Sequence, residues 1–154
     1  MSILEKRSSG VLLHVTSLPG PHGIGDFGIE SRNFVDWLVA AGQKLWQILP
    51  LGGIGPGNSP YMSSSAFAGN VLLIDLGELQ QRGWLSADDV APVPGLDAKR
   101  IDFGAMVSFR MERLARAAVR FAAQAGADER ADLEAFVQRH ADWLPDYALF
   151  MEDR

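Results

Sequence analysis

Residues 11–51 alternate between strand-like and helix-like patterns, and this alternation constrains the fold more than any other feature of the chain. Residues 11–18 are mostly apolar and predict a β-strand that ends at a Pro-Gly pair. Residues 31–41 predict a helix, because apolar side chains recur at spacings of three and four. Residues 44–51 predict the next strand. A strand, a helix and a strand within about 40 residues predict a βαβ unit with parallel strands in an α/β fold. The continuous apolar strands predict a sheet covered on both faces.

The second half of the chain has a helical character. Residues 105–125 predict a long helix, residues from 128 or 130 to 140 a second, and a third begins near Leu144. The change comes after Trp84, so we expect a first unit at residues 1–83 and a helical subdomain segment at residues 84–154. Between them, residues 71–76 are a short apolar run that predicts either a further strand or a packed loop segment.

The long predicted helix carries two patterns. One stripe is apolar and should face the core: Val107, Met111, Leu114, Ala118, Phe121 and Ala125. Four arginines cluster on the same helix, Arg110, Arg113, Arg116 and Arg120. We interpret the arginines as a solvated face, with an anion or partner site as the alternative.

Composition excludes several classes of function. The net charge is −5, which argues against a nucleic-acid surface. The absence of cysteine excludes disulfides, zinc-thiolate sites and cysteine nucleophiles. Residues 1–10 lack the apolar core of a signal peptide, and no run of about 18 apolar residues is present to span a membrane. We therefore expect a soluble, cytoplasmic protein.

The most informative candidate site follows the second predicted strand. A glycine-rich loop at residues 52–57 leads to Tyr61, which places this tyrosine just past the carboxyl end of a buried strand. Ligands bind at that end of the strands in α/β barrels and open α/β sheets. A tyrosine offers an apolar ring face and one hydroxyl, which suits a sugar. Phosphate binding is the weaker alternative, because the loop lacks a Gly-Lys-Ser/Thr ending.

The remaining polar candidates have competing interpretations. His14 lies in the first predicted strand, as a satisfied core residue or as part of a binding cleft. His22 is expected to be solvated in a loop, and His140 to lie on a helix surface. Asp26 and Asp75 are expected to bond nearby backbone amides, with a catalytic carboxylate as the alternative for either. The tryptophans Trp37 and Trp46 are expected in the core.

Four motifs follow one another along the chain: GVLLHVTSLPGPHGIGDFG at residues 10–28, FVDWL at 34–38, GQKLWQILPL at 42–51 and SPYMSSSAFAGN at 59–70. They resemble the amino-terminal part of the 4-α-glucanotransferases, also called amylomaltases or disproportionating enzymes. A weaker match to the same family is WLPDYALF at residues 143–150. Several long motifs in the right order make this resemblance specific.

The resemblance implies the first strands and helix of a (β/α)₈ TIM barrel, followed by a mostly helical inserted subdomain. It implies transfer of α-1,4-glucan segments, with retention, through a covalent glycosyl-enzyme and without cofactor or metal. It implies that Tyr61 packs against the donor sugar and that Ser59 lines the same cleft. His14 and Asp26 match positions at the rim of the first strand. Pro56 stands where many members have the tyrosine of a second glucan site.

The family's catalytic carboxylates belong to later strands, and none of those motifs occurs in this chain. We therefore expect a fragment that supplies one wall of a cleft for maltooligosaccharides, starch or glycogen and is inactive alone. The alternative is a non-catalytic α-glucan-binding or interaction module. Open βαβ edges also predict exposed apolar surface and self-association.

Overall fold

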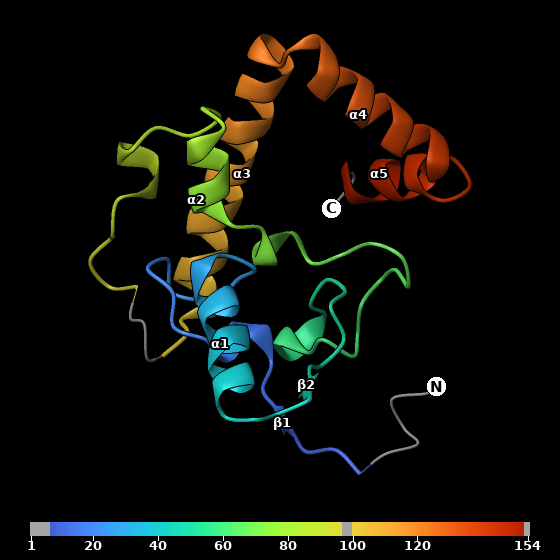
Figure 1. Ribbon diagram of the computed structural model, residues 1–154. Coiled ribbons are helices and arrows are strands. Elements are labelled where there is room, and N and C mark those ends of the chain that lie inside the picture. The colour runs from blue at the N-terminus through green and yellow to red at the C-terminus, as the bar shows by residue number, and fades with distance from the viewer. Residues whose placement is uncertain (1–6, 97–99, 153–154) are drawn as a thin grey trace.

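The computed structural model describes residues 7–96 and 100–152. Residues 1–6, which belong to the stretch expected to lack a signal peptide, lie outside the described residues, as do residues 153–154 at the end of the third predicted helix. The amino-terminal half is built on a βαβ unit of strand β1 (Gly10–Leu12), helix α1 (Ile29–Ala40) and strand β2 (Leu45–Gln47). The two strands pair in parallel, with Val11 opposite Trp46, which confirms the predicted parallel pairing. Figure 1 shows α1 beside this sheet.

Helix α1 packs on the sheet through aromatic contacts. Phe34 meets Trp46 edge-on at 5.0 Å between ring centroids, and the Trp46 indole N–H donates to the Leu13 carbonyl at 2.7 Å. The helix ends as predicted at Gly42, whose φ of 70° is the left-handed conformation that glycine adopts without strain. The prediction that Trp37 is a core residue is wrong, because Trp37 is 55% exposed and, among the described residues, its ring stacks on that of Phe34 alone.

Both strands are shorter than predicted. Residues after β1 turn into a one-turn 3₁₀ helix, η2 (Val15–Ser17), whose Val15 is fully buried. The prediction of a sheet covered on both faces is also wrong for this chain, since Leu12 and Leu45 are exposed. Two strands and one helix leave the second face of the sheet without a covering layer among the described residues.

The apolar run at residues 71–76 is a packed segment rather than a strand. It forms the 3₁₀ helix η4 (Val71–Leu73), in which Leu72 and Leu73 are buried. Helix α2 (Leu76–Gln81) follows at once, and the Asp75 carboxylate accepts a hydrogen bond from the Gly77 N–H at 2.8 Å. Asp75 therefore has the backbone-capping role that was expected of it.

The carboxyl-terminal half consists of the 3₁₀ helix η5 (Asp88–Val90) and the helices α3 (Phe103–Gln124), α4 (Ala127–Arg139) and α5 (Leu144–Glu152). All three predicted helices are present within about two residues of their expected starts. Figure 1 shows α3 beside α2 in the upper part of the molecule, α4 leading away from the carboxyl end of α3, and α5 folding back beneath α4.

Helix α3 supplies both hydrophobic clusters with core residues. Met106 packs with Ile24 and Leu72, and one turn further on Phe109 packs with Leu76 and Leu85. The predicted apolar stripe is not the most buried face of this helix, because Met111 and Ala118 are exposed. Four residues of that stripe, Met111, Leu114, Ala118 and Phe121, instead help to line an open apolar hollow of about 300 Å³, together with Val71, Ile74, Leu79 and Trp84. The buried face of α3 consists instead of Met106, Phe109, Arg110 and Ala117.

Candidate functional site

The loop between β2 and η4 is closed by backbone contacts. The Asn70 N–H donates to the Leu51 carbonyl at 2.7 Å, and Gly52 and Gly69 form an antiparallel bridge. At Gly55 the chain folds back so closely that a Cβ would lie 2.3 Å from the Met62 carbonyl oxygen. Only glycine fits such an approach. The loop that carries the candidate residues is therefore a fixed element at the carboxyl end of β2.

Ser59 and Tyr61 lie together in this loop. The Tyr61 N–H donates a hydrogen bond to the Ser59 Oγ at 3.3 Å, so the serine hydroxyl helps to set the turn. The Tyr61 side chain is 71% exposed. Packing inside the chain does not account for this aromatic ring, whose face and hydroxyl are accessible to a ligand.

His14 lies directly past the carboxyl end of β1, where the Leu13 N–H extends the ladder to the Gln47 carbonyl at 3.0 Å. Its side chain is half-buried, and burial lowers the pKa of the imidazole below its ordinary value. Its Nδ1 atom is buried and has no hydrogen-bond partner among the described residues. A buried polar atom of this kind is unusual in a folded protein, and it keeps His14 a candidate for ligand contact.

Asp26 is engaged by the protein itself. Its Oδ1 accepts from the Gly28 N–H at 3.0 Å, the backbone contact expected of a loop aspartate, and its Oδ2 pairs with the Arg110 Nη2 at 3.1 Å. Burial raises the pKa of the Asp26 carboxyl, although the positive charge of Arg110 opposes this shift. No hydrogen bond or ring contact joins Asp26 or His14 to Tyr61 within the residues that the structure describes. Ser59 and Tyr61 are thus the two candidates that the fold brings into direct contact.

Arg110 is a residue that the sequence patterns missed. Its side chain is 0% exposed, and it crosses from α3 to Asp26 and to the Ile74 carbonyl. The prediction of a solvated arginine face is therefore wrong for Arg110, whereas the Arg116 side chain is 47% exposed. The partner that explains the burial lies 84 positions away in the sequence, so no local pattern on the helix could reveal it.

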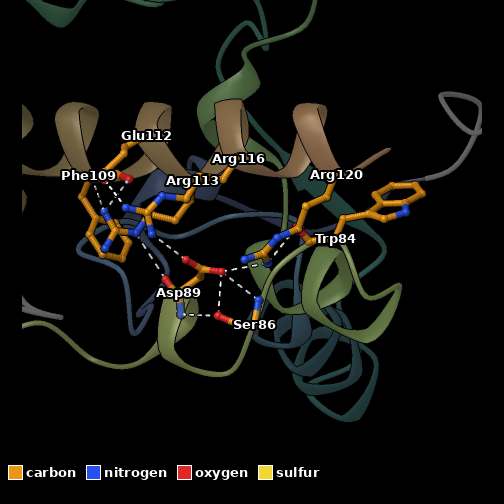
Figure 2. Close-up of polar contacts among 8 residues, drawn as sticks. All are labelled: Trp84, Ser86, Asp89, Phe109, Glu112, Arg113, Arg116 and Arg120. Carbon is orange, nitrogen blue, oxygen red and sulfur yellow. Dashed lines mark hydrogen bonds and ion pairs between the residues drawn. The ribbon is translucent and has the colours of Figure 1, made fainter. Parts of the chain in front are cut away.

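The other three arginines converge on Asp89, as Figure 2 shows. Arg116 and Arg120 pair with its carboxylate at 2.7 and 2.9 Å, and the Arg113 Nε donates to its backbone carbonyl at 3.2 Å. Ser86 and Asp89 also exchange hydrogen bonds, which hold the pKa of the Asp89 carboxyl far below its ordinary value. The anion that this arginine cluster binds is the Asp89 carboxylate of the same chain. The cluster therefore serves to pack η5 against α3.

Two further histidine predictions need revision. His22 is buried rather than solvated, with its Nε2 2.9 Å from the Val90 carbonyl and its ring stacked on Phe109. His140 is half-buried at the end of α4, where its ring contacts those of Phe136 and Trp143.

Comparison with known proteins decides the family. A family model described as 4-alpha-glucanotransferase matches residues 13–153. This chain belongs to the 4-alpha-glucanotransferase family. The resemblance seen in the sequence motifs is thereby confirmed, and it extends through the helical half that only a weak motif had suggested.

Individual relatives agree with this 4-alpha-glucanotransferase assignment. The 4-alpha-glucanotransferase of Thermus thermophilus is 48% identical over 145 residues, which cover 94% of this chain and 28% of that protein. The chloroplastic/amyloplastic 4-alpha-glucanotransferase of Solanum tuberosum is 38% identical over 95% of this chain and 26% of its own length. The chain thus spans little more than a quarter of the length of these curated relatives.

A solved structure matches as well. The amylomaltase from Streptococcus agalactiae, in complex with acarbose, superposes with a TM-score of 0.87 at 44% identity and covers 95% of this chain and 29% of that one. No helix among the described residues is long and apolar enough to cross a membrane. Nor do those residues gather three potential metal-ligating side chains at one point. In this chain, Ser59, Tyr61 and His14 carry hydrogen-bonding groups, and Tyr61 adds an exposed aromatic face.

Proposed function

We propose that this chain forms one wall of the glucan-binding cleft of a 4-α-glucanotransferase. The observation that carries the proposal is the exposed Tyr61 ring on a fixed loop past the carboxyl end of β2, in a chain that belongs to this family. The proposed ligands are α-1,4-glucans. Their pyranose rings have apolar faces that pack on an aromatic ring and hydroxyls that bond a polar rim.

The proposed architecture is a TIM barrel that begins with β1, α1 and β2. Parallel pairing of the strands and the positions of His14 and Tyr61 at the strand ends support it. Residues 1–83 would belong to the barrel and residues 84–154 to a helical subdomain docked on it through α3. The Arg110–Asp26 ion pair would then join the subdomain to the barrel rim.

The proposed reaction proceeds with retention, through a carboxylate nucleophile and a carboxylic acid that acts alternately as acid and base. We assign neither group to this chain. Its contribution is to bind and orient the donor sugar. Tyr61 would pack on the sugar next to the scissile bond, Ser59 would hold the tyrosine turn, and His14 would offer its free Nδ1 at the rim. Asp26 would act as a rim position fixed by Arg110.

Substitution of Tyr61 tests the proposal. In the complete transferase, Tyr61→Ala should lower kcat/KM for maltotriose disproportionation by roughly tenfold or more, because the stacking face is lost. Tyr61→Phe keeps the ring and should retain most of the activity. Both variants should melt within a few degrees of the wild type, since the side chain is exposed. An unchanged kcat/KM in Tyr61→Ala would remove this residue from the site.

The 154-residue chain by itself should not transfer glucan. Purified chain incubated with maltotriose should yield no glucose or longer maltodextrins on chromatography, because the proposed site lacks its carboxylate pair. Turnover by the chain alone would show that it holds a complete catalytic site. The alternative of a non-catalytic binding module gains no support from the relatives, which are named as transferases.

A further inference from the structure

One ring contact joins the loop that carries Tyr61 to the carboxyl-terminal helices. The Phe67 ring stacks on the Trp143 indole, with centroids 5.6 Å apart and planes inclined by 27°. In Figure 1, α5 lies next to the green loop that leads from β2 to η4. Phe67 remains 70% exposed in spite of the contact. Because so much of the ring stays in water, this stack is a contact that can open without unfolding the core.

The loop itself is rigid between Tyr61 and Phe67. The Ser63 hydroxyl donates to the Ser65 carbonyl at 2.9 Å, and the Ser65 Oγ accepts a hydrogen bond from the Phe67 N–H at 3.1 Å. On the other side of Tyr61, Ile54 packs against a hydrophobic cluster of the core. Two anchors therefore flank Tyr61 within one rigid loop, and the direction in which its ring faces depends on both of them.

Trp143 is in turn held by a histidine. Its indole N–H donates to the His140 Nδ1 at 3.3 Å, and the imidazole packs on Phe136 with ring centroids 4.5 Å apart. An indole nitrogen only donates, so this Nδ1 must be an unprotonated acceptor and the imidazole proton must be on Nε2. Protonation of Nδ1 would set two N–H donors against each other at the electropositive edge of the indole. The hydrogen bond therefore exists only while His140 is neutral.

The other charged and titratable groups at this junction come from three elements. Arg139 ends α4, Asp142 lies in the turn, and Asp146 and Tyr147 belong to α5. Within the described part of the chain, none of them forms an ion pair with His140. The loop contributes uncharged side chains, Ser64, Ser65, Ala66 and Phe67. Of these side-chain types, only histidine ordinarily changes its charge between about pH 5 and 8.

We propose that Trp143 is a positioning residue for the Tyr61 loop, and that neutral His140 keeps it docked on Phe67. The inference rests on the proposed function, because it concerns how Tyr61 is presented to the donor sugar. When His140 takes up a proton from solvent, Trp143 loses its hydrogen bond, the stack on Phe67 loosens and the loop loses its outer anchor. Binding of the donor therefore weakens in mild acid, although neither Trp143 nor His140 touches the sugar.

Tyrosine signals test this link, because the chain has two tyrosines, one on either side of the ring contact. Tyr61 lies on the loop, and Tyr147 contacts Trp143 with ring centroids 6.0 Å apart. In the protein labelled with ¹³C-tyrosine, acidification from about pH 7.5 to about pH 5.5 should shift both signals with one midpoint. Phe67→Ala should preserve the response of Tyr147 and abolish that of Tyr61. A wild-type Tyr61 signal that does not respond would overturn the inference.

Two substitutions of His140 isolate its role as an acceptor. His140→Asn keeps an acceptor and removes the charge, so the Tyr61 signal should no longer respond to pH. His140→Ala removes the acceptor, so the Tyr61 signal should hold its acid position at both pH values. Both variants lose the ring contact with Phe136, and the difference between them reports the hydrogen bond alone. A Tyr61 response that persists in His140→Asn would assign the titration to His14 at the rim and overturn the inference.

Kinetics of the complete transferase show whether the link acts through Tyr61. Phe67→Ala should raise KM for maltotriose about two- to fivefold with little change in kcat. The same substitution should have no further effect in a Tyr61→Ala background. The matched control is Trp37→Ala, which removes an exposed tryptophan from another stacked pair, also at 5.6 Å, and should leave KM unchanged.

The double variant separates positioning from direct contact with the sugar. An equal effect of Phe67→Ala with and without the Tyr61 ring would overturn the positioning role. If Tyr61→Ala lowers kcat/KM and Phe67→Ala does not, the proposed function stands and this inference falls. If neither substitution changes kcat/KM, both proposals fall.

Discussion

Arg110 connects the two halves of the chain through one buried guanidinium. Its Nη2 serves both the Asp26 carboxylate and the Ile74 carbonyl, while Nε and Nη1 are buried without a hydrogen-bond partner among the described residues. Burial lowers the pKa of Arg110 and raises that of Asp26, so desolvation outweighs the attraction between the two charges. A pair of this kind adds little net stability, yet removal of one partner leaves the other charge buried without a counter-charge.

Removal of Arg110, which leaves the Asp26 charge without its partner, tests the importance of this pair. Arg110→Ala should reduce the free energy of unfolding by about 3–5 kcal/mol, because the buried Asp26 carboxylate loses its counter-charge. The double variant Arg110→Met with Asp26→Asn removes both charges and keeps most of the volume, so it should recover a large part of that loss. Urea unfolding of the two variants and the wild type measures both effects. Equal losses in the single and double variants would mean that packing, not charge, dominates at Arg110.

The lowered pKa of the Asp89 carboxyl leads to a prediction about stability in acid. Hydrogen bonds from Ser86 and from the arginines hold the pKa of its carboxyl far below the ordinary value. Its stabilising contribution is complete above the unfolded pKa of about 4 and is lost as the pH falls from there toward the folded pKa. Asp89→Asn should therefore melt lower at pH 7, by at least about 2–4 °C, and lose less further stability on acidification.

Melting curves between pH 7 and pH 3 for the wild type and Asp89→Asn check this prediction. Asp26 titrates in the opposite sense, because its pKa is raised and its ionisation opposes folding. The Asp26 contribution is the same in the wild type and in Asp89→Asn, so it cancels in the difference between their melting temperatures. That difference isolates the contribution of Asp89. Parallel curves for the two proteins would show that the Asp89 carboxylate is not the origin of the acid sensitivity.

At the scale of elements, α3 organises the molecule and its first turn is capped. The Asp102 Oδ1 accepts a hydrogen bond from the Ala105 N–H at 3.1 Å. Asp102→Ala should lower the free energy of unfolding by about 1 kcal/mol, because a terminal donor of the helix loses its partner. Asp102→Asn keeps a good capping group and should stay close to the wild type in urea unfolding. A loss of the same size in both variants would point to the charge and not to the cap.

The helices could be predicted from the sequence because their signals are local. The spacing of apolar residues gave the range of α3 to within two residues, and Gly42 marked the end of α1. The face that α3 buries could not be predicted in this way. The aliphatic part of Arg110 can be buried like an apolar side chain because the Asp26 carboxylate pairs with its guanidinium. Asp26 is distant in the sequence, so the spacing of residues along the helix does not reveal this pair.

The same contrast holds for the candidate site. Tyr61 could be found because it follows a strand signal and a glycine loop, and the structure leaves its ring exposed. The Phe67–Trp143 contact could not be found, because it joins positions 76 residues apart that share no local pattern. Sequence patterns thus located the loop that we propose presents ligands, and only the fold showed which residues lie opposite that loop.

At the scale of the whole molecule, apolar surface remains open on the outer side of α3. The hollow of about 300 Å³ between α2, η4 and α3 is lined almost entirely by apolar side chains. The relatives are more than three times as long as this chain, which covers 28% of the Thermus thermophilus protein. Surface of this kind promotes association in water, since its burial is favourable by roughly 25 cal/mol per Å².

Self-association is accordingly a prediction for the purified chain. Its sedimentation coefficient should rise with protein concentration, and Met111→Lys should suppress the rise, because Met111 is 46% exposed in the hollow and a charge there resists burial. Val119→Lys is the matched control: it is 70% exposed on the same helix but does not line the hollow, so its sedimentation should follow the wild type. Equal suppression by both variants would assign the effect to net charge. A wild-type coefficient independent of concentration would mean that this apolar face does not drive association.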